Sequence, residues 1–211
     1  MSDINGFVHI IESPSSTDLM DGRTEGRVLS EVLRLAAIPY CYNLTVDRAV
    51  LSDALWPRLL EARETHGREP ILHLSMHGNA EGVALTSGEF LSWNNLRGLL
   101  RPLVAAMQRG LLVCMSSCFG SAGCRMAMYT DNEPHFRALV GNSASATWAD
   151  AAIAYASFCH PFFKGMPLET CVESMKVASG DRNFVFFTGA QTKANGVYSL
   201  NRISLRSGTS S

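Results

Sequence analysis

The sequence predicts an α/β protein, a three-layer α/β/α sandwich built on a mostly parallel sheet of about six strands with a small hairpin. Short apolar runs alternate along the chain with segments whose apolar residues recur at helical spacing. The 211 residues are 46% hydrophobic and only 18% charged, which suits a sheet covered on both faces. No internal repeat or linker divides the chain, so we expect one domain over residues 1–205 and a disordered polar tail over residues 206–211.

The amino-terminal part is expected to alternate strands with helices. Strands are predicted at residues 7–11, 39–46 and 71–76, with a loop over 13–17 and a helix over 26–37. Asp47 is placed to cap the next helix, and Trp56-Pro57 should break that helix and start another, because proline suits the first helical turn. Residues 83–85 and 89–91 predict the hairpin.

The carboxyl-terminal part continues the alternation. We expect helices at residues 93–108, 150–163 and 167–178, and strands at residues 111–116, 138–141 and 184–187. The strand at 111–116 is apolar throughout, which is typical of a parallel strand buried on both faces.

Charge and cysteine content narrow the class of partner and the compartment. The 18 Lys and Arg residues balance 19 Asp and Glu residues, a formal charge of −1, so there is no electrostatic footprint for nucleic acid or an anionic membrane. The amino terminus lacks the basic start of a signal peptide, and no apolar stretch approaches the roughly 18 residues that span a bilayer. We therefore expect a cytoplasmic protein whose six cysteines are reduced.

Two predicted strands run into residues that can carry chemistry. The strand at 71–76 is followed by His77-Gly78, and the strand at 111–116 by Ser117-Cys118. Because the carboxyl ends of parallel strands meet at one edge of a sheet, His77 and Cys118 should lie on the same rim. An imidazole and a helix amino terminus both favour the thiolate form of a cysteine. The backbone N–H groups of Gly78 and Cys118 are candidates for an oxyanion hole.

These motifs resemble those of the caspase-like (clan CD) cysteine peptidases, and among them the CHAT group shared with separases. In the family, one apolar strand is followed by the pattern small-x-His-Gly, which residues 72–78 match. A second apolar strand is followed by small-small-Cys-x-small, which residues 112–121 match. The resemblance implies a caspase-like fold with Cys118 as nucleophile and His77 as general acid–base. The segments at 22–26, 42–45 and 146–150 are also similar to the family. In the last of these, Trp148 and Asp150 match a Trp and an acidic residue that help select a basic P1 side chain in relatives.

Alternative interpretations of the same residues are weaker. Residues four apart on a strand lie about 13 Å apart, so His73 with His77, or Cys114 with Cys118, cannot share one zinc ion, and we expect no metal or other cofactor. His73 is expected to pack within its strand. Cys41, Cys124, Cys159 and Cys171 fall on apolar faces and are expected to fill the core. The aromatic residues Phe158, Phe162 and Phe163 are expected to pack a helix on the sheet.

The sequence thus favours a cysteine endopeptidase that performs limited proteolysis of a protein partner and is switched by a regulatory protein. The resemblance to stand-alone bacterial CHAT proteins adds a role in defence, antiviral defence included, or in cell death. Two other functions stay open. One is a catalytically silent caspase-like module that binds a partner, and the other is a cysteine hydrolase or acyltransferase that acts on a small molecule.

Overall fold

A central sheet of eight strands organises the chain. The structure is a computed structural model that describes residues 6–107, 110–128 and 136–194. The main path of the sheet has the order β2-β1-β3-β6-β7-β8, and the β4–β5 hairpin is attached to the end of β3. The strands are β1 (Gly6–Ser13), β2 (Tyr40–Leu44), β3 (Glu69–Asn79), β4 (Gly82–Ala84), β5 (Phe90–Ser92), β6 (Leu112–Ser116), β7 (Ala138–Asn142) and β8 (Phe184–Thr188).

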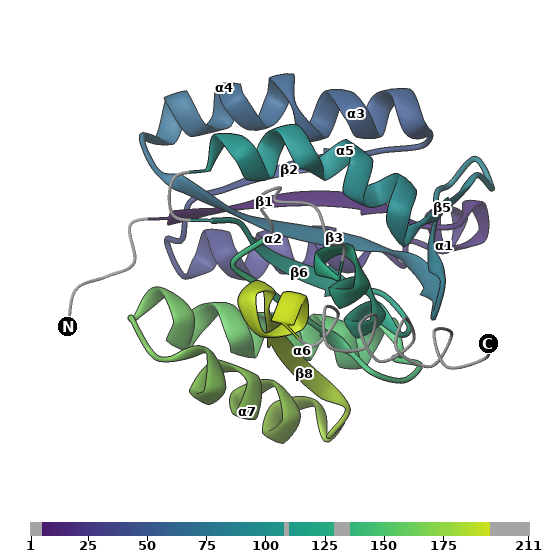
Figure 1. Ribbon diagram of the computed structural model, residues 1–211. Coiled ribbons are helices and arrows are strands. Elements are labelled where there is room, and N and C mark those ends of the chain that lie inside the picture. Colours follow the sequence, from purple (N-terminus) through teal and green to yellow (C-terminus); the bar gives the residue numbers. More distant parts are fainter. Residues whose placement is uncertain (1–5, 108–109, 129–135, 195–211) are drawn as a thin grey trace, which may run out of the picture.

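The five strands from β2 to β7 along this path are parallel, and only β8 runs antiparallel to its neighbour β7. Their carboxyl ends therefore share one edge, on the right of Figure 1, where the β4–β5 hairpin and the short helix α1 (Ser16–Met20) also lie. This shared edge is what brings residues far apart in the sequence to one place.

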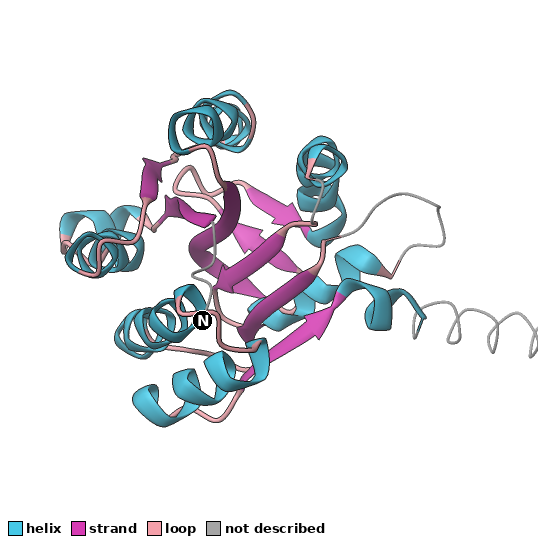
Figure 2. Cartoon of the chain, turned by 90° about the vertical axis from the view of Figure 1, so that its left-hand side faces the viewer, coloured by secondary structure: helices cyan, strands magenta, loops and turns pink. Residues whose placement is uncertain are grey.

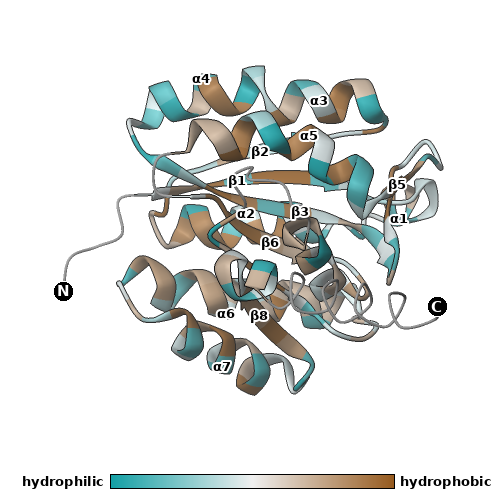
Figure 3. Ribbon diagram, in the orientation of Figure 1, coloured by the Kyte–Doolittle hydropathy of each residue, from teal (hydrophilic) through white to brown (hydrophobic). Residues whose placement is uncertain are grey.

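Helices cover both faces of the sheet, which gives three layers (Figures 1 and 2). One face carries α3 (Arg48–Leu55), α4 (Pro57–His66) and α5 (Trp93–Ala106), and the other carries α2 (Glu25–Leu35), α6 (Trp148–Phe163) and α7 (Leu168–Ser179). Each face has its own apolar core: Leu51, Leu59 and Leu100 lie in the first, and Leu29, Phe158 and Met175 in the second. The strands between them are mostly hydrophobic in Figure 3, as burial on both faces requires.

The predicted fold class and most elements are confirmed. Asp47 caps α3, since its side chain accepts a hydrogen bond from the Val50 N–H at 2.9 Å, and Pro57 begins α4. Phe158, Phe162 and Phe163 are buried between α6 and the sheet. Residue 108, at the end of one predicted helix, and the predicted tail at 206–211 lie outside the described residues.

Three local predictions were wrong in detail. The expected loop over 13–17 holds the start of α1, because Ser15 caps a helical turn by accepting from the Asp18 N–H. The strand predicted at 71–76 continues through His77 and Gly78 to Asn79, because those residues pair with β4. Cys41 and Cys124 are only partly buried, so they do not belong to the core. Among the described residues no helix has the length and apolar character to cross a membrane.

Candidate active site

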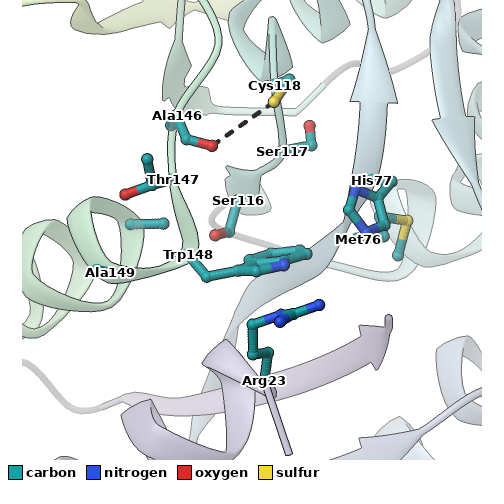
Figure 4. A pocket seen from close by; sticks show the side chains of 11 residues that line it. Arg23, Met76, His77, Ser116, Ser117, Cys118, Ala146, Thr147, Trp148 and Ala149 are labelled. Carbon is teal, nitrogen blue, oxygen red and sulfur yellow. Dashed lines mark hydrogen bonds between the residues drawn. The ribbon is translucent and has the colours of Figure 1, made fainter. Parts of the chain in front are cut away.

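A cavity of about 370 Å³ opens at the carboxyl edge of the sheet, on the face covered by α2 and α6. Figure 4 shows that Cys118 and His77 both line it, one from the end of β6 and the other from the end of β3. The lining residues are Arg23, Met76, His77, Ser116, Ser117, Cys118, Ala146, Thr147, Trp148, Ala149 and Ala151. Sequence reasoning placed the two candidate catalytic residues on one rim, and the structure puts them in one cavity.

A tight turn at the end of β6 presents Cys118. Phe119, the next residue, has a left-handed backbone with φ of 55°, which costs a non-glycine residue free energy and occurs at functional turns. Gly120 permits the turn, because a Cβ there would lie 2.5 Å from the Met115 carbonyl oxygen. The turn leads into a 3-10 helix, η1 (Gly120–Ala127). The Cys118 side chain is thus fixed at the mouth of the cavity by the backbone on both sides of it.

The Cys118 thiol donates a weak hydrogen bond to the Ala146 carbonyl oxygen, with a sulfur–oxygen distance of 3.6 Å (Figure 4). No hydrogen bond joins it to His77, which lines the cavity across from it. Catalytic hydrogen bonds are often long or absent before substrate binds, so the lack of a direct contact does not exclude the pair.

His77 is held firmly although it is half-exposed. Its Nε2 lies 2.6 Å from Asp18 Oδ2, and its ring meets the ring of Trp148 edge to face at 5.1 Å between centroids. Nε2 is therefore the nitrogen that carries the proton toward the carboxylate, and Nδ1 has no hydrogen-bond partner among the described residues. A histidine with one nitrogen fixed by an acid and the other open to a cavity has the arrangement of a general base.

Asp18 is the site residue that sequence reasoning missed. Its side chain is only 7% exposed, and it accepts hydrogen bonds from Ser15, Arg23 and His77. Burial works to raise the pKa of Asp18, but these hydrogen bonds together hold it well below its ordinary value, so the carboxylate stays ionised. The spacing Ser15-x-x-Asp18 is a helix-capping pattern, and that signal was present in the predicted loop.

The two predicted oxyanion donors lie where backbone packing is close. A Cβ on Gly78 would be 2.9 Å from the Gly82 carbonyl oxygen and 3.2 Å from the Ser117 side chain, so only glycine fits beside the Cys118 turn. Within the described residues the Cys118 N–H makes no hydrogen bond, which leaves it able to donate to a ligand. Gly78 pairs with Val83 in the β3–β4 ladder.

Buried polar residues lie beneath the cavity. Glu12, Ser75 and Ser116 occupy matched positions on three neighbouring strands, and Glu25 lies close to both serines. Burial works to raise the pKa of Glu25, but its ion pair with His73 at 3.0 Å and the two serine hydroxyls hold it below the ordinary value. One carboxylate oxygen of Glu25 and the hydroxyls of Ser75, Ser116 and Ser117 have no hydrogen-bond partner of standard geometry. Ser116 and Ser117 also line the cavity, although their hydroxyl oxygens are buried just beneath its surface.

The amino terminus of α6 forms the opposite wall. Trp148 lines the cavity as the sequence led us to expect of a substrate-binding residue, but Asp150 is not among the lining residues. Asp150 accepts a hydrogen bond from the Thr147 hydroxyl at 2.7 Å, and its N–H donates to the same hydroxyl oxygen. This reciprocal pair caps α6. The positive end of a 16-residue helix therefore faces the cavity, in addition to the short η1 that follows Cys118.

Three of the other five cysteines are more deeply buried than Cys118. Cys114, Cys159 and Cys171 are buried in the core, where burial raises the pKa of each thiol, to about 12 for Cys159 and about 11 for Cys171. Burial also raises the pKa of Cys124. Such thiols stay protonated and unreactive near neutral pH. Among the described residues no group of three or more His, Cys, Asp or Glu side chains is arranged to hold a metal ion.

Comparison with known proteins supports the fold. No family model matches the sequence, and no curated protein matches it. The solved structure of gingipain R (RgpB), described as an Arg-specific cysteine proteinase, matches with a TM-score of 0.52 at 11% identity, over 88% of this chain and 46% of that chain. A complex of the pro- and mature domains of RgpB from Porphyromonas gingivalis gives 0.49 at 11% identity, over 87% and 46%. The chain thus spans less than half of the gingipain R chain, and the likeness shows a caspase-like cysteine proteinase fold.

Proposed function

We propose that the chain is a cysteine endopeptidase in which Cys118 is the nucleophile and His77 the general acid–base. The observation that carries the proposal is the shared cavity: a thiol on a tight turn and an acid-oriented imidazole face one space, at the shared edge of a parallel sheet. The caspase-like fold supports the same assignment.

The proposed reaction has two stages. The Cys118 thiol transfers its proton to Nδ1 of His77, and the thiolate attacks the carbonyl carbon of the scissile peptide bond. The negative charge that develops on the carbonyl oxygen is stabilised by the N–H groups of Cys118 and Gly78. His77 then protonates the leaving amine, which leaves a thioester on Cys118. In the second stage His77 removes a proton from water, the hydroxide attacks the thioester, and the acid product and the Cys118 thiolate are released.

Asp18 acts in this proposal as a positioning residue. Its carboxylate holds Nε2 of His77, so that Nδ1 faces the cavity, and it stabilises the positive charge that the imidazole gains after the first proton transfer. Trp148 packs against the other side of the His77 ring and limits its rotation.

The cavity favours a basic side chain at the P1 position of the substrate. Trp148 and the neighbouring alanines provide an apolar wall for an aliphatic stem, and Ser116 and Ser117 offer hydroxyl acceptors on the floor. Glu25, behind Ser116, is a buried carboxylate that is itself paired with His73 at 3.0 Å. Arg23 also lines the cavity, but it is paired with Asp18 at 2.9 Å and with Asp21 at 2.7 Å, so its charge is already balanced. Gingipain R is described as Arg-specific, and the same preference is proposed here on the residues of this chain.

The wider biological role rests on sequence resemblance. The motifs around His77 and Cys118 support a place in the CHAT and separase group, limited proteolysis of a protein partner in the cytoplasm, control by a regulatory protein, and a role in bacterial defence or cell death. Two of the solved structures that match are of gingipain R.

A second candidate is acyl transfer or hydrolysis on a small molecule with the same two residues. The volume of about 370 Å³ favours it, because pockets for small ligands begin at roughly 300 Å³. The third candidate function is a catalytically silent binding module. This candidate does not explain why the imidazole of His77 is oriented by Asp18.

The deciding experiment compares wild type with Cys118→Ala and His77→Ala on a peptide library that varies P1. Cys124→Ala serves as the matched control, because it removes a half-buried thiol outside the cavity. Cleavage after Arg or Lys by wild type and by Cys124→Ala, and by neither of the other variants, supports the proposal. Wild-type cleavage by Cys118→Ala contradicts the nucleophile, and a preference for Asp or Glu at P1 contradicts the basic pocket and points to Arg23. Turnover of small thioesters but of no peptide would favour the second candidate.

A further inference from the structure

A second cavity lies at the opposite edge of the sheet from Cys118. It has a volume of about 210 Å³, and residues 36–39, between α2 and β2, line it together with Arg68, His160, Phe163 and Lys164. Arg68 lies between α4 and β3, and His160 and Lys164 lie at the end of α6. Two connections that lead into parallel strands and the carboxyl end of α6 thus border one space, at the edge of the sheet opposite His77 and Cys118.

Every charged side chain in this lining is basic. Arg68 and Lys164 carry permanent positive charges, His160 can gain one, and no Asp or Glu is among the lining residues. None of the three side chains forms a hydrogen bond or ion pair with any described residue. The nearest acid in the sequence, Glu69, is already paired with Arg63 at 2.7 Å. Other arginines of the chain, such as Arg23 and Arg34, have acidic partners.

Helix electrostatics account for only part of this arrangement. Basic residues are favoured at a helix carboxyl terminus, which suits His160 and Lys164 at the end of α6. Arg68 follows Gly67, the C-cap of α4, and it is partly buried with five N–H donors that have no acceptor in the described chain. A partly exposed guanidinium whose N–H groups have no protein acceptor is available to a ligand that brings acceptor oxygens.

The chemistry of the lining identifies the class of ligand. Guanidinium, ammonium and imidazolium groups around one space suit an oxyanion with several acceptor oxygens, and arginine matches phosphate with two parallel hydrogen bonds. One water molecule occupies roughly 30 Å³ in the liquid, so a cavity of about 210 Å³ has room for several water-sized groups. A phosphate group alone would leave part of this cavity unfilled. Ile38 and Phe163 give the remaining space an apolar side.

We propose that this cavity binds a phosphate group, either free or carried by a small organic molecule, and that Arg68, His160 and Lys164 hold it. The site is separate from the proposed catalytic residues, so it stands or falls independently of the peptidase assignment. An organic phosphate binds more tightly than inorganic phosphate, because its apolar part reaches Ile38 and Phe163.

The test is a titration at constant ionic strength, followed by amide chemical shifts and by calorimetry, with inorganic phosphate and phenyl phosphate as probes. Saturable shifts at Ala37 and Lys164, with phenyl phosphate the tighter ligand, support the proposal. Arg68→Gln and Lys164→Gln are each expected to weaken binding by about tenfold, since each removes a charge-assisted hydrogen bond. Arg182→Gln removes an exposed arginine that is not part of the cavity and should leave binding unchanged.

Two results would overturn the site. One is a linear, unsaturated response to both probes, which is the behaviour of general ionic screening. The other is equal binding by wild type, Arg68→Gln and Lys164→Gln, which would show that the basic residues serve only the helix ends. Lys164 is exposed and Arg68 is partly exposed, so the variants should fold, and circular dichroism checks this.

Discussion

Two histidine–carboxylate pairs lie on the same face of β3, with their histidines four residues apart. The pairs contain the same kinds of side chain but differ in exposure and in access to the cavity. His77 and Asp18 meet at the rim with a separation of 2.6 Å, and the imidazole is 45% exposed. His73 and Glu25 meet inside the protein at 3.0 Å, and both are almost fully buried. One pair leaves a ring nitrogen open to a cavity, and the other is enclosed by Tyr155 and the sheet. Position along one strand therefore separates a pair suited to catalysis from a pair suited to structure.

The largest expected effect is on catalysis at the rim. His77→Ala should lower kcat/KM for the best peptide by about 10⁴-fold, because it removes the general acid–base. The free energy of unfolding should change by no more than about 1 kcal/mol, as is usual for a pair that is partly exposed. Steady-state kinetics and urea unfolding on the same samples measure both quantities. Activity near the wild-type level would place the acid–base elsewhere.

Breaking the buried pair of His73 and Glu25 should mainly lower the free energy of unfolding. Glu25→Gln leaves His73 without its anion, and removal of one partner of a buried ion pair costs about 3–5 kcal/mol of unfolding free energy. Urea unfolding measures it. The double variant Glu25→Gln/His73→Asn should recover part of the loss, because both charges are then gone. Additive losses in the double variant would mean that the two side chains are not coupled.

A second buried histidine, His9, has no carboxylate partner among the described residues. His9 on β1 is fully buried, its Nε2 lies 2.9 Å from the Ala54 carbonyl oxygen, and its Nδ1 has no hydrogen-bond partner. Burial lowers the pKa of His9 to about 4. The unfolded chain therefore binds this proton first, so stability is lost as the pH falls from about 6.5 toward 4.

The expected loss from His9 is about 3 kcal/mol over that range, at about 1.4 kcal/mol per pH unit. Urea unfolding at several pH values between 7 and 4 should show it, and His9→Gln should flatten the slope. An unchanged slope in His9→Gln would assign the acid sensitivity to other groups.

Asp18 should matter more for rate than for substrate binding. Asp18→Asn keeps the size of the side chain but removes the charge that stabilises the His77 imidazolium, so kcat should fall by about 10- to 100-fold while KM changes little. Asp18→Glu keeps the charge and should restore part of kcat. A rise in KM with kcat unchanged would assign Asp18 to substrate binding through Arg23 instead.

The sequence predicted the fold class and the position of His77 and Cys118 on one rim because both depend on local patterns. Apolar runs and capping residues such as Asp47 mark the elements, and strand ends mark His77 and Cys118. Asp18 and Glu25 could not be predicted as partners of histidines. Asp18 is 59 positions from His77 in the chain, and Glu25 is 48 positions from His73. Only the parallel register of β1 and β3 brings the members of each pair together. Cys41 and Cys124 were misplaced for the same reason, because the burial of a half-apolar position is decided by neighbours distant in sequence.

Substitution of Asp150 is expected to have the smallest effect on stability and on substrate selection, in contrast to substitutions near the buried Glu25. The sequence assigned it to P1 selection, whereas its carboxylate accepts from Thr147 at the start of α6, outside the cavity lining. Asp150→Ala keeps the backbone N–H that Thr147 caps and removes only the carboxylate that accepts from the Thr147 hydroxyl, so it should cost at most about 1 kcal/mol of stability and leave the ratio of kcat/KM for P1 Arg over P1 Ala unchanged. Ser116→Ala, on the cavity floor in front of Glu25, should lower that ratio. If Asp150→Ala lowers the ratio and Ser116→Ala does not, the acid at the helix end selects the substrate, and the negative charge beneath the sheet is purely structural.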